Sequence, residues 1–286
     1  MIVKSDDLLA ILPFTLLVAV AIGVLVVDLF HRRGALRSYQ ASLSAVGLGV
    51  VAIVTVMVGK RLEPGAYFDG MVFHDGFGTF LHVLFLLIAA ASVLLSPRYL
   101  QRNDGERGEY YGLVLLATSG MMLMASAGNL LMLFLGIEIM SMSVYVLVGF
   151  FRQQLASSEA SLKYFFLGAF ASALFLYGMA LIYGTTGSLE LPQIGAAIQR
   201  SLGLANAGLV NVAEESGATS LDPLFFIGML LLLVALAFKI ALVPFHMWTP
   251  DAYTGAPTAV VGFMATAVKA AGFAALIRVL FIALGP

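Results

Sequence analysis

Three ionisable residues lie inside long apolar stretches of the sequence. Glu138, Lys239 and Lys269 remain near the middle of hydrophobic runs once the charges in loops and at predicted helix ends are set aside. A charged group that faced lipid at that depth would cost about 2.5 to 3.5 kcal/mol or more. We therefore expect all three side chains to face the protein interior or an internal chain of water.

These residue types suit proton transfer. A carboxylate and an ammonium group about 4 Å apart attract each other by about 4 kcal/mol at an effective dielectric constant near 20. A small movement that separates Glu138 from Lys239 would therefore favour release of the lysine proton. In the alternative interpretation, the charged residues only fix helix packing. We favour proton transfer because one carboxylate cannot neutralise two lysines.

A proline follows Lys239 within the same apolar run. Pro244 removes a helical hydrogen bond, and a broken helix beside a buried lysine is common in ion paths through membranes. A simple kink is the alternative. His246 lies seven residues after Lys239, so on a continuous helix both would lie on roughly one face, two turns apart. The ordinary pKa of histidine, near 6.5, suits a proton relay, although a packing role is equally compatible with the sequence.

Charged residues near predicted helix ends have simpler interpretations. Lys163 follows Glu159 by four residues, a spacing typical of an ion pair on a helix surface, or the lysine could extend to the membrane interface. Asp28 and Arg278 are expected to be interfacial.

The elements that carry these residues are predicted to be membrane-spanning helices. The chain has 286 residues, of which 61% are hydrophobic and 11% charged, too little charge to cover a soluble protein of this size. Several runs approach or exceed the roughly 20 apolar residues that cross a bilayer. We predict an all-α integral membrane protein with about eight transmembrane helices, at 8–30, 40–59, 77–96, 110–127, 129–150, 160–185, 223–249 and 257–284. The first run is too long for a secretory signal and lacks a cleavage site, so it is interpreted as a retained span.

The connections define one membrane domain over residues 1–286. Residues 127–129 are expected to join two spans in a tight antiparallel pair, and the acidic connection 186–222 to hold a short surface helix. Arginines predominate on one side of this topology, which the positive-inside rule assigns to the cytoplasm. A multi-pass protein of the inner (plasma) membrane with its N-terminus outside is therefore expected. The residues that set this bias are Arg32, Arg33, Arg37, Arg98, Arg102, Arg107 and Arg152, against Lys4, Lys60, Arg61 and Arg200.

Composition also excludes several kinds of chemistry. The chain has no cysteine, which rules out disulfides and cysteine-bound iron–sulfur clusters, and its four histidines lack paired metal-ligand spacing. No cofactor or metal is therefore expected in this chain. A net charge of −1 without a basic tract argues against nucleic acid, so the lipid bilayer is the expected surrounding.

Four motifs closely resemble subunit N of bacterial NADH:quinone oxidoreductase, the family of mitochondrial subunit 2 in respiratory complex I. They are LGIEIMSMSVYVLVG at 135–149, SLKYF at 161–165, FKIALVPFHMWTPDAY at 238–253 and GAPT at 255–258. The resemblance implies a non-redox, proton-translocating, antiporter-like subunit of this enzyme. Its expected partners are other membrane-arm subunits, and NADH, flavin, iron–sulfur clusters and quinone are expected to bind elsewhere in the complex.

The resemblance also implies roles for individual residues. Glu138 and Lys239 correspond to a charge pair of the family, Lys269 connects this pair to a central water axis, and Lys163 contributes as well. His246 stands where the family has a histidine on the same path. Residues 110–286 resemble the first five-helix antiporter-like repeat with its discontinuous helix, after three accessory helices in 1–109.

The sequence departs from the family in length. The family has a second, inverted repeat, whereas this sequence stops at Pro286, so either it is a fragment or a second polypeptide is expected to supply the remainder. Two other functions stay open at this point. One is a freestanding or multisubunit cation/proton antiporter, and the other is a membrane assembly scaffold in which Glu138 and Lys239 do no transport.

Overall fold

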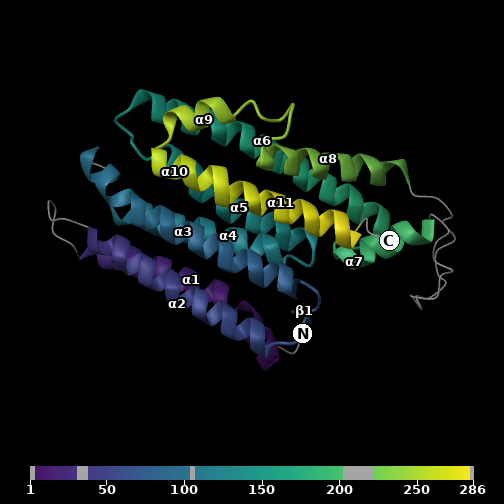
Figure 1. Cartoon of the computed structure of the whole chain (residues 1–286). Helices are drawn as coiled ribbons and strands as arrows, with labels where there is room; N and C mark the ends of the chain where they lie inside the picture. Colours follow the sequence, from purple (N-terminus) through teal and green to yellow (C-terminus); the bar gives the residue numbers. More distant parts are fainter. Residues whose placement is uncertain (1–3, 31–37, 104–106, 202–221, 284–286) are drawn as a thin grey trace.

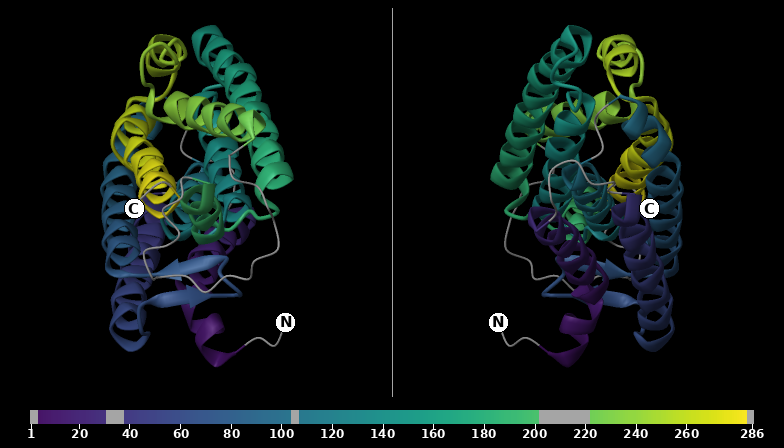
Figure 2. Two further views of the ribbon diagram at one scale, coloured as in Figure 1. Left: turned by 90° about the vertical axis from the view of Figure 1, so that its right-hand side faces the viewer. Right: turned by 90° about the vertical axis from the view of Figure 1, so that its left-hand side faces the viewer.

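Long antiparallel helices make up the chain in a computed structural model, which describes residues 4–30, 38–103, 107–201 and 222–283 (Figure 1). Two end-on views show them packed as one bundle (Figure 2). The elements are α1 (Ser5–Leu29), α2 (Ser38–Arg61), β1 (Gly65–Tyr67), β2 (Val72–His74), α3 (Gly76–Arg102), α4 (Gly108–Ser126), α5 (Leu130–Val148), α6 (Leu155–Thr186), α7 (Leu191–Ser201), α8 (Pro223–Ile240), α9 (Thr249–Gly255), α10 (Thr258–Phe263) and α11 (Lys269–Arg278). The π-helical segments η2 (Met264–Val268) and η3 (Val279–Ala283) continue α10 and α11.

The predicted membrane architecture is confirmed. Among the described residues, seven helices are long and apolar enough to cross a membrane, with α10 to η3 counted as one span of 26 residues. The remaining predicted span is α4, which lies inside the bundle. Of its 19 residues, 15 are buried, so its side chains contact protein and can be less apolar than those of a lipid-facing helix.

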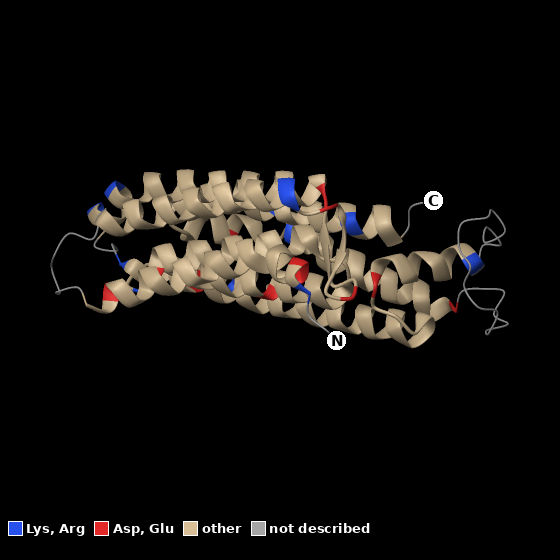
Figure 3. Ribbon diagram, turned by 90° about the horizontal axis from the view of Figure 1, so that it is seen from below, with Lys and Arg blue, Asp and Glu red and all other residues tan. Residues whose placement is uncertain are grey.

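The bundle presents an apolar outer surface. Large side chains such as Leu95 on α3, Phe166 on α6 and Leu230 on α8 are mostly exposed. Such a surface is stable in lipid and would aggregate in water. Few charged residues interrupt the long helices (Figure 3), so each charge in their middle sections needs a partner inside the bundle.

Helices α4 and α5 form the tight antiparallel pair that residues 127–129 predict. Asn129 caps α5 by accepting a hydrogen bond from the Met132 N–H at 2.8 Å. Further along, a Cβ on Gly120 would lie 2.7 Å from the carbonyl oxygen of Gly136. The two backbones therefore approach as closely as helices joined by small residues do.

A two-stranded hairpin that the sequence did not predict covers the turn between α4 and α5. Strands β1 and β2 are antiparallel, and the N–H of Gly128 in the turn donates to the carbonyl of Met71 at 2.8 Å. The predicted surface helix of the acidic connection is α7, which buries Leu191 and Ile194. The rest of that connection, residues 202–221, lies outside the described part of the chain.

Candidate functional site

Lys239 lies in the last turn of α8, and its side chain is buried. The residue is 3% exposed. Its ammonium group donates hydrogen bonds to the Ser141 hydroxyl at 2.7 Å and to the Tyr145 hydroxyl at 3.3 Å. Both partners belong to α5, so α5 presents two neutral oxygens to a charge that the bilayer interior disfavours.

Glu138 lies on α5 one turn before Ser141 and is half-buried. Its carboxylate accepts a hydrogen bond from the Ser172 hydroxyl of α6 at 2.5 Å. Among the residues that the structure describes, no ion pair within 4.0 Å joins Glu138 to Lys239. The acidic and the basic residue thus lie on facing helices, and each is held by a hydroxyl group.

Aromatic side chains pack around Lys239. The Tyr145 ring lies edge-on against Tyr164, with the ring centroids 4.7 Å apart, and Tyr164 stacks on Trp248 at 4.5 Å. The Lys239 ammonium is 5.6 Å from the Tyr145 centroid, within range of a cation–π contact. This layer excludes the bilayer from the lysine and fixes the position of the Tyr145 hydroxyl.

The helix that carries Lys239 is discontinuous, as predicted. Helix α8 ends at Ile240, Ala241 adopts a left-handed conformation with φ of 57°, and the next helix begins only at Thr249. The Trp248 indole N–H donates to the carbonyl of Phe238 at 3.0 Å, and the same oxygen accepts the Ala241 N–H at 3.1 Å. Pro244, in a cis peptide with Val243, lies within the break and not at its start.

The predicted position of His246 relative to Lys239 is wrong. The spacing of seven residues places the two on one face only if the helix continues, and residues 241–248 are not helical. His246 is exposed on the surface of the described chain, away from the hydroxyl groups that hold Lys239. A relay through His246 therefore remains a hypothesis from the resemblance alone.

Lys269 is the first residue of α11 and is half-buried. Its ammonium group lies 5.7 Å from the ring centroid of Tyr253 on α9. No carboxylate of the described residues lies within 4.0 Å of it. The Tyr253 hydroxyl is buried and has no hydrogen-bond partner among the described residues, so it could form a hydrogen bond with a water molecule between the break and α11.

Lys163 makes the predicted ion pair with Glu159 on the surface of α6, at 2.8 Å. A second carboxylate, Asp251 of α9, lies 3.1 Å from the same ammonium group. Sequence spacing could not reveal Asp251, which comes from the segment after the break. The three side chains are about half exposed, so this cluster is more accessible than Lys239.

Arg278 lies near a helix end, and its side chain is buried within the protein, which the sequence did not indicate. It is 5% exposed and forms a bidentate pair with Asp75, at 2.5 and 2.7 Å. It also donates to the carbonyl of Ala125 at 2.8 Å. The hairpin and the start of α3 cover Arg278 at this end of the bundle. Asp28, the other residue expected to be interfacial, is half-buried and accepts a hydrogen bond from Gln40 at 2.6 Å.

The Asp75 carboxylate lies before the first residue of α3 and caps that helix. Burial raises its pKa, but hydrogen bonds from Arg278 and from the Gly78 N–H, together with the Arg278 charge, lower it by more, so the pKa lies below its ordinary value of 3.8. Nearby, His82 makes hydrogen bonds to the Met122 carbonyl and to Ser126, each at 2.9 Å. This polar cluster joins α3, α4 and α11.

Sequence reasoning missed the hydroxyl groups of the site. Ser141 and Tyr145 follow Glu138 by three and seven residues, so helical periodicity alone could have placed them on the same face. Ser172 carries no such signal, because only the packing of α6 on α5 brings it to Glu138. Within the described ranges, no three histidine, aspartate or glutamate side chains converge on a metal position.

The fold and the site define a class of protein: a multi-pass α-helical membrane protein in which a broken helix holds a buried lysine against a neighbouring helix that carries a carboxylate. Residues 127–285 match the family model described as NADH:quinone oxidoreductase/Mrp antiporter, TM. The match covers more than half of the chain, and the chain belongs to this family.

Curated relatives point to one branch of the family. The chain is 40% identical to NADH-quinone oxidoreductase subunit N 1 of Koribacter versatilis over 294 aligned positions, which cover 99% of this chain and 54% of that protein. It is 41% identical to NADH-quinone oxidoreductase subunit N of Trichlorobacter lovleyi, over 98% of this chain and 54% of that protein. The chain therefore spans about half the length of these relatives.

Solved structures share the fold. A chain of respiratory complex I from Thermus thermophilus is 36% identical, has a TM-score of 0.71, and is matched over 93% of this chain and 52% of its own length. A chain of the Mrp complex from Dietzia sp. DQ12-45-1b is 22% identical with a TM-score of 0.72, over 97% of this chain and 49% of that one. The second likeness shows the fold alone.

Proposed function

We propose that the chain acts as a non-redox, proton-translocating subunit in the membrane arm of an NADH:quinone oxidoreductase. One observation carries the proposal: Lys239 is buried beside a helix break and contacts hydroxyl groups, with no carboxylate within 4.0 Å among the described residues. The names of the curated relatives support the choice of enzyme.

A permanent ion pair would hold the lysine proton in place. Hydroxyl groups stabilise an ammonium ion less than a carboxylate does, yet they can also bond to the neutral amine, because a hydroxyl both donates and accepts. Lys239 can therefore exist in either protonation state in the same pocket. Glu138 is close enough in the fold that a small helix movement would bring it nearer and favour the charged state.

The proposed route uses residues from several helices. Protons pass between Glu138 and Lys239 and on to Lys269, with Lys163 and His246 as outer members. The free energy comes from other subunits, which hold NADH, flavin, iron–sulfur clusters and quinone. The chain belongs in this proposal to the inner membrane, with its N-terminus outside, and divides into accessory helices in 1–109 and an antiporter-like repeat in 110–286.

The test measures proton pumping by the assembled complex in inverted membrane vesicles. With NADH as electron donor, quenching of a pH-sensitive dye should fall by about tenfold or more in Lys239→Ala and in Glu138→Ala, and less in Glu138→Asp, which keeps the charge. Lys60→Ala, an exposed lysine at the end of α2, is the matched control and should pump normally. Normal pumping by Lys239→Ala, with assembly confirmed on a native gel, would contradict the proposal.

A cation/proton antiporter is the second candidate, because the matching family model covers Mrp antiporters as well. That function predicts sodium-dependent proton exchange by vesicles that receive no NADH. The two candidate functions can be distinguished by the energy source that drives proton movement. Exchange driven by a sodium gradient alone, abolished by Lys239→Ala, would favour the antiporter, whereas pumping that requires NADH would favour the first proposal.

A further inference from the structure

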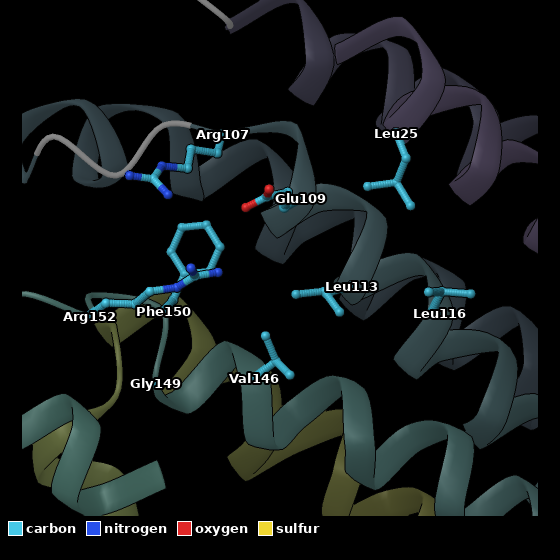
Figure 4. A pocket seen from close by; sticks show the side chains of 9 residues that line it. All are labelled: Leu25, Arg107, Glu109, Leu113, Leu116, Val146, Gly149, Phe150 and Arg152. Carbon is cyan, nitrogen blue, oxygen red and sulfur yellow. The ribbon is translucent and has the colours of Figure 1, made fainter. Parts of the chain in front are cut away.

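A cavity lies between α1, α4 and α5 at the end of the bundle where α4 begins and α5 ends (Figure 4). Its volume is about 260 Å³, several times the roughly 30 Å³ that one water molecule occupies in the liquid. Apolar side chains from three helices form one part of its lining: Leu25, Leu113, Leu116 and Val146. This part could not hold ordered water well.

The rest of the lining is charged. Arg107, Glu109 and Arg152 lie around the same opening, with the Phe150 ring between the two arginines (Figure 4). Their formal charges add to +1. Both arginines are exposed, and among the residues that the structure describes neither makes an ion pair within 4.0 Å. Two exposed guanidinium groups at one opening, without an ion pair among the described residues, suit a phosphate, which arginine binds through two parallel hydrogen bonds.

The charged and apolar parts are separated along the helix axis. Arg107 precedes the first residue of α4, whereas Leu113 and Leu116 lie roughly 9 to 14 Å deeper, at 1.5 Å per residue. On α5, Val146 is 50% exposed, and Met142, one turn deeper on the same face, is 52% exposed. An apolar track thus leads from the cavity toward the middle of the bilayer.

We propose that this cavity binds an anionic phospholipid. Arg107 and Arg152 bind its phosphate at the opening, beside the Phe150 ring, and one acyl chain follows Leu116, Val146 and Met142. The order of groups matches an amphiphile in a membrane, with charge at the helix ends and apolar contact below it. The arginine bias assigns this end to the cytoplasm, where anionic lipids attract basic side chains near helix ends. This inference is independent of the proton route through Lys239.

The first test measures lipid retention by native mass spectrometry of the purified chain in detergent. Phosphatidylglycerol is the anionic probe, and phosphatidylethanolamine the comparison. The double variant Arg107→Gln/Arg152→Gln should retain phosphatidylglycerol on the order of tenfold less, because each arginine near the surface contributes a several-fold preference. Retention of phosphatidylethanolamine should fall less, because its ammonium group offsets the phosphate charge, and Glu109→Gln should retain phosphatidylglycerol better.

Arg102→Gln provides the matched control, because Arg102 is an exposed arginine at the end of α3 that does not line the cavity. It should retain phosphatidylglycerol within about twofold of the unmodified chain. Equal losses in Arg102→Gln and the double variant would show that only the general charge matters and would overturn the site. Full displacement of the lipid by millimolar inorganic phosphate would also overturn it, because a bound acyl chain should resist a free anion.

A second measurement works without the arginine variants. The chain has no cysteine, so Val146→Cys can carry a single bimane label in a lipid nanodisc. Brominated phosphatidylglycerol should quench this label several-fold more than brominated phosphatidylethanolamine at the same mole fraction. Equal quenching by the two lipids would overturn the proposal, since an anionic lipid would then not be selected next to Val146.

Discussion

At the scale of single residues, the surroundings of Lys239 decide how easily it exchanges a proton. The two hydroxyl oxygens of α5 satisfy its ammonium group at 2.7 and 3.3 Å. A hydrogen bond to a charged group contributes about 1.5 to 3 kcal/mol. In the proposed proton route, the partners of the lysine should therefore matter nearly as much as the lysine itself.

We expect Ser141→Ala to slow NADH-driven proton pumping by about tenfold, because it removes the shorter hydrogen bond to Lys239. Tyr145→Phe should have a smaller effect, about threefold or less, since that bond is longer and the ring that packs on Tyr164 remains. Ser143→Ala is the control: Ser143 lies on the same helix, and its hydroxyl donates to the Ile139 carbonyl and to no other group of the described residues. Similar pumping by Ser141→Ala and Ser143→Ala would refute a role for the hydroxyl.

The Asp75–Arg278 pair should stabilise the protein in a pH-dependent way. Because its pKa in the folded protein is below 3.8, the Asp75 carboxylate contributes stability that is fully present above that pH and is lost as the pH falls through the folded value. Asp75→Asn should cost about 2 to 3 kcal/mol at pH 6, less than the roughly 3 to 5 kcal/mol of a fully buried pair, because Asp75 is partly exposed.

Thermal unfolding in detergent measures this effect. The midpoint of Asp75→Asn should be several degrees below that of the unmodified chain from pH 5 to 7, and the gap should close as the pH falls below 3.8. Asp69→Asn, in the turn between the hairpin strands, should show no comparable gap at pH 6. A constant difference at all pH values would mean that the charge of Asp75 does not stabilise the fold.

The residues that carry charge in the apolar runs could be predicted, but their partners could not. Glu138, Lys239 and Lys269 stand out because ionisable groups are rare in such runs. The partner of Arg278 could not be predicted, because its pairing with Asp75 spans more than 200 residues of sequence. Hydroxyl partners such as Ser172 are common residue types and give no signal alone.

At the scale of elements, glycines set how closely the helices pack. A Cβ on Gly120 would lie 2.5 Å from the amide nitrogen of Met140, and one on Gly178 of α6 would lie 2.6 Å from the carbonyl oxygen of Gly228 of α8. Atoms of the backbone cannot move aside as a flexible side chain can. These two contacts hold α5 against α4 and α8 against α6, which in turn brings Lys239 to Ser141.

Gly120→Ala should therefore destabilise the bundle by about 1 to 3 kcal/mol, as overpacking does. Gly23→Ala, on α1, is the control because nothing lies within 4 Å of its new methyl group. Alanine also favours a helix over glycine, so Gly23→Ala should raise the midpoint of thermal unfolding in detergent slightly. A midpoint for Gly120→Ala equal to or above that of Gly23→Ala would show that α4 and α5 can separate without cost.

The break after α8 shows how far an element can be predicted. Pro244 correctly predicted a discontinuity, because proline cannot continue the hydrogen-bond ladder. The helix nevertheless ends four residues earlier, at Ile240, because Ala241 turns into a left-handed conformation and Trp248 folds back to bond the Phe238 carbonyl. That second contact depends on the tertiary fold, so the position of His246 could not be derived from helical spacing.

At the scale of the whole molecule, the topology predicts which ends of the bundle face each side of the membrane. Single cysteines at Gln153, between α5 and α6, and at Glu63, after α2, lie at opposite ends and are exposed. An impermeant thiol reagent applied to intact cells should label Glu63→Cys and not Gln153→Cys. Labelling of Gln153→Cys from outside would reverse the orientation that the arginine bias predicts.

Helix α6 is longer than the hydrocarbon core of the membrane is thick, which places the cluster around Lys163 near the membrane surface. Its 32 residues extend for about 48 Å, against a hydrocarbon core of about 30 Å, so one or both ends reach the headgroups. Lys163 lies near the first end, with Glu159 and Asp251 beside it, and the three formal charges add to −1. A cluster of side chains with a net negative charge at the membrane surface attracts cations from the water and raises their local concentration. In the proposed proton route, this cluster would raise the concentration of protons at the membrane surface next to α6.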